Sequence, residues 1–206
     1  MLAGVLVMAV IPALVYLLWH AGRPPQPGLA AALVKTASTA LLALGGLVAG
    51  APAAIVAGLA FGALGDFALA RPGERAFLAG MAAFGAGHLA YAMAFWTGDP
   101  GPWWAVGAVL ALAGSTEVWL APRVPRPMRW PVRAYVGLIA AMGVAALCQS
   151  GSAVLAGVGL FLLSDTLLAW EKFVAGNPVR LASRAVWVCY CSGQALILWG
   201  GTTGLS

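Results

Sequence analysis

The sequence predicts an all-α polytopic membrane protein with eight transmembrane helices. Of its 206 residues, 62% are hydrophobic and only 8% are charged, whereas soluble domains carry about 25% charged residues. The apolar residues form continuous runs rather than the alternating pattern of a membrane β-barrel. A bilayer-spanning helix takes about 20 residues, so eight spans use about 160 and leave only short loops. We therefore expect a single eight-helix transmembrane domain over residues 1–206.

Proline and glycine residues separate eight apolar runs along the chain. The first run has no basic residue before it and no polar cleavage region after it, so we expect a retained helix rather than a signal peptide. The expected spans are 2–19, 29–49, 52–70, 76–97, 102–121, 131–149, 152–173 and 182–200.

The basic residues are distributed asymmetrically between the loops. Of 11 Lys and Arg residues, ten lie in or beside loops 1, 3, 5 and 7, and the exception, Lys35, lies well inside the second span. By the positive-inside rule the odd-numbered loops are cytoplasmic and both termini face outward. Helical spans favour an inner membrane over an outer membrane. Topology therefore explains the net charge of +5 without a nucleic-acid partner.

Several polar side chains lie inside the spans, mostly in the cytoplasmic half. With a rise of 1.5 Å per residue, Asp66 lies roughly 6 Å and Lys35 roughly 9 Å from the cytoplasmic face. A charge inside a bilayer costs at least about 2.5–3.5 kcal/mol, so these groups should face the bundle interior. We expect one polar pocket open to the cytoplasm, with the two aspartates within reach of each other. The candidate residues are Lys35, Asp66, His88, Tyr91, Tyr135, Ser164, Asp165, Tyr190 and Gln194.

Structural roles compete with functional ones at several of these positions. Lys35 can extend its amine to the headgroups, and His88 can serve a purely structural hydrogen bond. Tyr135 can belong to the interfacial aromatic belt. An aspartate close to a helix end can act as a cap. The two aspartates and Lys35 in one layer favour function over these alternatives.

Two segments 99 residues apart suggest an internal repeat. Both Gly65–Ala70 and Ser164–Ala169 read small-Asp-x-x-Leu-Ala, and a tyrosine follows each aspartate by 25 residues. A parallel four-plus-four repeat would pair the third span with the seventh and the fourth with the eighth. Chance similarity in a chain rich in Ala, Gly and Leu is the alternative.

Common hydrolytic and metal motifs are absent from the sequence. It contains no Gly-x-Ser-x-Gly nucleophile elbow and no phosphate-binding Gly-rich loop. Its only histidines, His20 and His88, cannot form a three-histidine zinc site. A magnesium site held by two carboxylates stays open as an alternative, but we expect no metal and no other cofactor.

A set of motifs spread from Lys35 to Gln194 resembles the YhhN family. It comprises Phe61–Asp66, Gly80 through His88–Tyr91, Phe161–Thr166, and Tyr190 with Gln194. Thr36 is a departure, because family members commonly carry Lys-Pro there. Animal members of the family include lysoplasmalogenase, an eight-span enzyme. The resemblance implies hydrolysis of the vinyl ether bond of a lysoplasmalogen to a fatty aldehyde and glycerophosphoethanolamine or glycerophosphocholine.

The residue types suit that chemistry. A vinyl ether resists nucleophiles but is cleaved after protonation of its outer carbon, which gives an oxocarbenium ion that water captures. One protonated carboxyl and one carboxylate meet this need, as at glycosidic bonds. We therefore expect Asp66 and Asp165 as the acid and the base or stabiliser, in either order. The substrate-binding candidates are Lys35, His88, Tyr91, Tyr135, Ser164, Tyr190 and Gln194.

Two other functions compete with this one. A hydrolase of another lysolipid or ether lipid would use the same groups. A small-molecule or lipid transporter would use buried Asp, Lys and His for proton transfer. The expected partners are a lysophospholipid and membrane lipids, with neither nucleic acid nor an obligatory protein partner.

Overall fold

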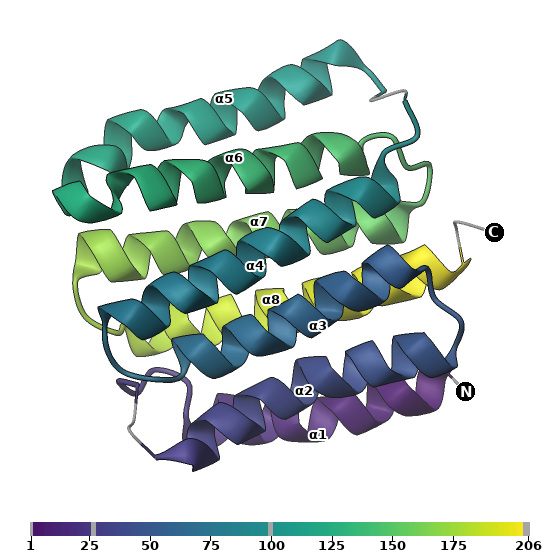
Figure 1. Ribbon diagram of the computed structural model, residues 1–206, viewed down its shortest axis with the longest axis horizontal. Helices are drawn as coiled ribbons and strands as arrows, with labels where there is room; N and C mark the ends of the chain where they lie inside the picture. Colours follow the sequence, from purple (N-terminus) through teal and green to yellow (C-terminus); the bar gives the residue numbers. More distant parts are fainter. Residues whose placement is uncertain (1, 26–27, 99–100, 204–206) are drawn as a thin grey trace.

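The computed structural model describes residues 2–25, 28–98 and 101–203, and each of the eight expected ranges overlaps one α-helix (Figure 1). Short 3-10 turns η1 and η2 join α5 to α6, and one π-helical turn, η3, extends α7. The elements are α1 (Leu2–Trp19), α2 (Leu29–Val48), α3 (Ala53–Leu69), α4 (Glu74–Phe95), α5 (Trp103–Trp119), η1 (Ala121–Arg123), η2 (Arg126–Met128), α6 (Arg129–Ala146), α7 (Ser152–Trp170), η3 (Glu171–Ala175) and α8 (Arg180–Thr203).

Within the described residues, six helices are long and apolar enough to cross a membrane, namely α1, α2, α4, α5 with η1, α7 with η3, and α8. The chain is therefore a multi-pass membrane protein. The helix α3 is apolar but has only 17 residues. The helix α6 begins with Arg129 and includes Arg133, which lower its mean hydropathy. Eight spans thus remain a prediction.

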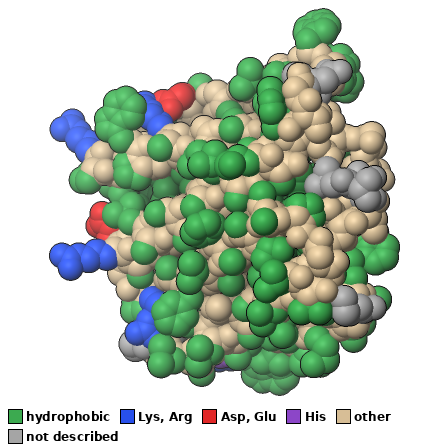
Figure 2. All heavy atoms as spheres, turned by 45° about the vertical axis from the view of Figure 1, so that its right-hand side comes forward, with side chains coloured by type: hydrophobic (Ala, Val, Ile, Leu, Met, Phe, Trp, Pro, Cys, Tyr) green, Lys and Arg blue, Asp and Glu red, His purple; other side chains and the backbone are tan. Residues whose placement is uncertain are grey.

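The odd-numbered connections all lie at one end of the bundle, on the left of Figure 1. Figure 2 shows Lys and Arg side chains gathered along that end, while hydrophobic side chains cover much of the remaining visible surface. Large apolar side chains are highly exposed on the helix flanks, for example Trp103 at 84% and Leu181 at 79%. Lipid tails rather than water suit such a surface. That the basic end faces the cytoplasm remains a prediction.

Helix contacts follow a pattern that a four-plus-four repeat would produce. In the first half α1 packs on α2, α2 on α3, and α3 on α4, and the second half repeats these contacts from α5 to α8. Between the halves, α2 contacts α8 and α4 contacts α6. A pseudo-two-fold axis that relates α2 to α6 and α4 to α8 would exchange these two contacts. The repeat itself stays a prediction, now with matching helix neighbours.

The hairpin of α7 and α8 depends on close backbone approach at glycine. A Cβ on Gly157 would lie 2.9 Å from both the carbonyl oxygen of Gly193 and the backbone nitrogen of Ile197. A Cβ on Gly159, two residues along the same helix, would meet nothing within 4 Å. Small residues of this kind allow apolar helices to pack tightly within a membrane.

We expect Gly157→Ala to lower the free energy of unfolding by about 1–3 kcal/mol, because backbone atoms of α8 cannot rotate away from the new methyl group. The matched change Gly159→Ala should be neutral or stabilising by about 0.5–1 kcal/mol. Thermal unfolding of both variants in detergent provides the comparison. Equal midpoints for the two variants would contradict the proposed packing.

Candidate active site

A first polar cluster surrounds Asp66, which lies on α3 and is 1% exposed. The Lys35 amine on α2 lies 3.6 Å from Asp66 Oδ1. The hydroxyls of Thr39 on α2 and Tyr190 on α8 donate hydrogen bonds to Asp66 Oδ2 at 2.8 and 2.9 Å. Three helices from both halves of the chain therefore converge on this carboxylate.

Lys35 faces the bundle interior rather than the headgroups. Its amine lies 5.6 Å from the ring centroid of Tyr16 and 5.7 Å from that of Trp187, close enough for cation–π interactions. Its side chain is 15% exposed. With these contacts and the ion pair to Asp66, Lys35 is a buried ion-pair partner and not a lysine that extends to the headgroups.

Two further predicted residues extend the first cluster. Gln194 donates a hydrogen bond from Nε2 to the Tyr190 hydroxyl at 3.2 Å, and Tyr91 donates to Gln194 Oε1 at 2.5 Å. Both residues are buried. The predicted residue Ser164 lies outside this cluster, because its hydroxyl donates to the backbone carbonyl of Val186 at 3.0 Å and so ties α7 to α8.

A second polar cluster surrounds Asp165 on α7. The Tyr135 hydroxyl on α6 donates a hydrogen bond to Asp165 Oδ2 at 3.1 Å. His88 on α4 places Nε2 3.3 Å from the same oxygen and 3.1 Å from the Tyr135 hydroxyl. The three groups form a compact triangle in which protons can pass between an imidazole, a phenol and a carboxyl.

Aromatic rings lie between the two clusters. Phe161 contacts the Tyr190 ring at 5.3 Å between centroids and the His88 ring at 4.9 Å, both edge-to-face. Phe84 packs edge-to-face against Tyr190 and Phe161 at 5.6 and 6.3 Å. Instead of the single expected pocket, the structure therefore holds two carboxylate clusters joined through an aromatic layer.

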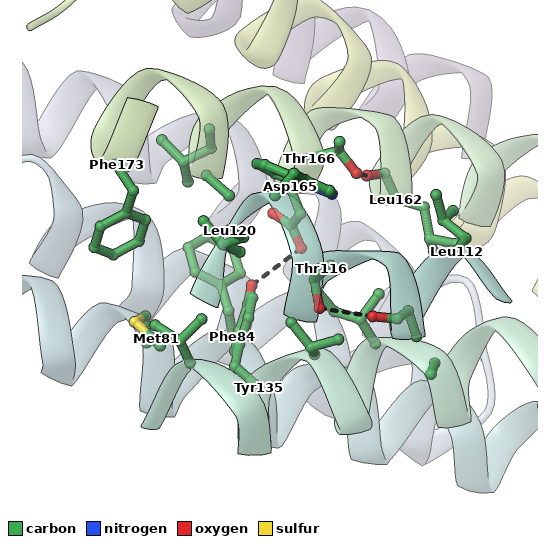
Figure 3. Close-up of a pocket in the computed structure, with 18 of the residues that line it drawn as sticks. Met81, Phe84, Leu112, Thr116, Leu120, Tyr135, Leu162, Asp165, Thr166 and Phe173 are labelled. Carbon is green, nitrogen blue, oxygen red and sulfur yellow. Dashed lines mark hydrogen bonds between the residues drawn. The ribbon is translucent and has the colours of Figure 1, made fainter. Parts of the chain in front are cut away.

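An apolar cavity opens beside Asp165 (Figure 3). It comprises ≈ 920 Å³ of unoccupied space, counting the part open to the surroundings, and residues from α3 to α7 and η3 line it. Of the predicted site residues, Asp165 and Tyr135 line this cavity. Two threonines on its wall, Thr116 and Thr166, donate their hydroxyls to carbonyls of their own helices. Asp165 and Tyr135 are thus the ionisable groups offered to its occupant.

One nitrogen and one oxygen in the clusters are buried without a hydrogen-bond partner, namely His88 Nδ1 and Asp66 Oδ1. Asp66 Oδ1 faces the Lys35 amine at ion-pair distance. His88 Nδ1 has no such neighbour among the described residues and could accept or donate one hydrogen bond to a bound molecule. Within the described residues, no group of three or more His, Cys, Asp or Glu side chains could hold a metal ion.

Sequence reasoning missed Thr39, Trp187 and the two phenylalanines of the aromatic layer. Thr39 follows Lys35 by four residues and therefore shares its helix face. This spacing could have identified Thr39 from the sequence. Nothing in the spacing distinguishes Phe84 and Phe161 from ordinary core residues. Their place between the clusters depends on how α4, α7 and α8 meet.

Comparison with known proteins matches residues 30–201 to the model of the YhhN family. The human lysoplasmalogenase TMEM86B is 37% identical over 135 residues, covering 66% of this chain and 57% of the relative. Its pig counterpart is 34% identical, covering 90% of this chain and 80% of the relative. The cattle lysoplasmalogenase TMEM86A is 32% identical, covering 69% and 62%.

The match thus spans a little over half of the human relative's length and four fifths of the pig relative's length. No solved structure matches the chain significantly. The family model covers most of the chain and includes both carboxylate clusters. The chain belongs to the YhhN family.

Proposed function

We propose that this protein is a membrane hydrolase that cleaves the vinyl ether bond of lysoplasmalogens. The observation that carries the proposal is the position of Asp165 and Tyr135 on the wall of a mostly apolar cavity. The lining suits a single-chain lipid, because the hydrocarbon would contact apolar side chains while the ether end would meet the carboxyl group. The names of the relatives from human, pig and cattle support the substrate class.

In this proposal Asp165 is the proton donor. Its protonated carboxyl transfers a proton to the outer vinyl carbon, and the double bond becomes an oxocarbenium ion. Water adds to the cationic carbon and returns a proton to the carboxylate, which gives a hemiacetal. Collapse of the hemiacetal releases a fatty aldehyde and the glycerophospho-base. His88 and Tyr135 hold the carboxyl group and relay protons, since both contact Asp165 Oδ2.

Asp66 takes the anionic role in the same proposal. It forms an ion pair with Lys35 and accepts hydrogen bonds from Thr39 and Tyr190. It does not line the cavity, so it acts across the aromatic layer through its electric field rather than by contact with substrate. Tyr91 and Gln194 then serve as positioning residues for Tyr190.

The outer wall of the cavity suggests how a lipid would enter. The helix α5 has no buried residue and packs mainly on α6 and η1. Val109, Leu112 and Ala113 of α5 line the cavity. We propose that the alkenyl chain enters from the lipid phase beside α5. The headgroup would face the basic end of the bundle, which we place on the cytoplasmic side of an inner membrane.

The test uses the purified protein with three single-chain lipids that carry the same headgroup. We expect fatty aldehyde from the 1-alkenyl lipid and no reaction with the saturated 1-alkyl ether, which lacks the carbon that accepts the proton. In D₂O the aldehyde, trapped by reduction, should carry one deuterium on carbon 2. Absence of aldehyde from the alkenyl lipid refutes the proposal, and fatty acid from a 1-acyl lipid would point to the competing lysolipid hydrolase.

A further inference from the structure

A second hollow adjoins the apolar cavity at the basic end of the bundle. It comprises ≈ 890 Å³ of unoccupied space, counting the part open to the surroundings. Leu69, Phe77 and Phe173 line both the hollow and the apolar cavity, so the two spaces are adjacent. The hollow is lined by charged residues as well as apolar ones. A ligand in the cavity would therefore have this charged space beside it.

Three cations from separate elements line this hollow, Arg71, Arg123 and Lys172. Arg71 follows α3, Arg123 ends η1 and Lys172 lies on η3. Glu74 is the carboxylate that lines the hollow with them. Positive charge therefore exceeds negative charge around a space that adjoins an apolar cavity.

Arg123 donates a hydrogen bond to the Trp119 carbonyl, but within the described residues the three cations lack carboxylate partners. No carboxylate of the described residues lies within ion-pair distance of Arg71, Arg123 or Lys172. Arg71 Nη1 is buried and has no hydrogen-bond partner. A buried guanidinium nitrogen without an acceptor is costly, and an anion in the hollow would satisfy it. The Lys172 amine is held over the Phe77 ring at 4.9 Å, at the junction of the two spaces.

From these contacts we infer that the hollow binds the phosphate of a single-chain glycerophospholipid whose hydrocarbon occupies the apolar cavity. The inference rests on the proposed function for the lipid class. Lys172 follows Asp165 by seven residues, or about 10 Å along the helix. Six bonds separate the ether carbon from the phosphorus, about 7 Å when extended. The long Lys172 side chain covers the difference, so the ether can lie at Asp165 while the phosphate meets the cations.

Binding tests this inference independently of catalysis. The ligand is 1-alkyl-glycerophosphocholine, whose saturated ether is not hydrolysed, and 1-alkylglycerol is its counterpart without phosphate. We expect Arg71→Gln and Lys172→Gln each to weaken binding of the phospholipid by about 10- to 100-fold and to leave alkylglycerol binding unchanged. Arg126→Gln, the same change at the same end but outside the hollow, should bind both ligands like the wild type.

Two further ligands identify the source of the phosphate. Inorganic phosphate alone should not compete at millimolar concentration, and a two-chain phosphatidylglycerol should bind equally to Arg71→Gln and to the wild type. Equal losses for phospholipid and alkylglycerol, or no loss in either variant, would overturn the inference. Competition by free phosphate would mean that the hollow binds an inorganic anion rather than a lipid, and would also overturn the inference. Phosphate-dependent binding without aldehyde release would instead refute the proposed function and leave this site standing.

Discussion

Replacing Asp165 with Asn is expected to reduce the rate of aldehyde release by about 10²- to 10⁴-fold, the range that a general acid contributes. Asparagine has nearly the shape of aspartic acid and can still accept a hydrogen bond from Tyr135, but its amide cannot protonate a vinyl carbon. The initial rate at saturating alkenyl lysolipid measures this effect. Because proton donation belongs to the chemical step, the loss should appear in kcat.

The control for this experiment is Glu117→Gln, which makes the same chemical change on α5. Glu117 pairs with Arg133 at an exposed position and does not line the cavity beside Asp165. We expect wild-type activity from this variant. Thermal unfolding of both variants separates a catalytic loss from a folding defect. If a folded Asp165→Asn variant retained the wild-type rate, Asp165 would not be the proton donor.

Replacing Lys35 with Met is expected to lower the free energy of unfolding by about 3–5 kcal/mol, as for other buried ion pairs that lose one partner. The Asp66 side chain is 1% exposed, so its charge would have neither its cation nor water nearby. The double variant Lys35→Met/Asp66→Asn removes both charges and should recover much of the loss. Thermal unfolding in detergent measures all three proteins.

The exposed pair between Arg133 and Glu117 provides the contrast. Its nitrogen and oxygen lie 2.6 Å apart, closer than in the buried pair, but the two side chains are 41% and 48% exposed. We expect Arg133→Met to change stability little, because water solvates Glu117 when its partner is removed. A large effect at Arg133 together with a small effect at Lys35 would contradict this account of the buried cluster.

The helices themselves could be predicted closely from the sequence. The expected first span, 2–19, coincides with α1, and the expected seventh span, 152–173, starts with α7 and ends within the π-helical turn that extends it. Continuous apolar runs and proline-containing breaks are local signals, so they predict element type and bounds without knowledge of the fold. At 131–149 the structure differs: α6 starts at Arg129, because the helix includes arginines in its first turns, and it ends at Ala146.

The partners of each carboxylate could not be predicted in the same way. The spacing placed Tyr190 25 residues after Asp165, yet its hydroxyl bonds to Asp66. His88 follows Asp66 along the chain but lies against Asp165. Helical periodicity shows which residues share a face of one helix, but it carries no information on which helix that face meets.

The sequence by itself thus determined a multi-helix membrane protein with basic residues at one end of the bundle, because hydropathy and charge act residue by residue along the chain. Only the tertiary structure decided that the polar residues form two clusters, that an aromatic layer joins them, and that Asp165 rather than Asp66 borders the cavity. These features depend on long-range contacts of α2 with α8 and of α4 with α6. Such contacts arise from side-chain packing between helices, which no local pattern encodes.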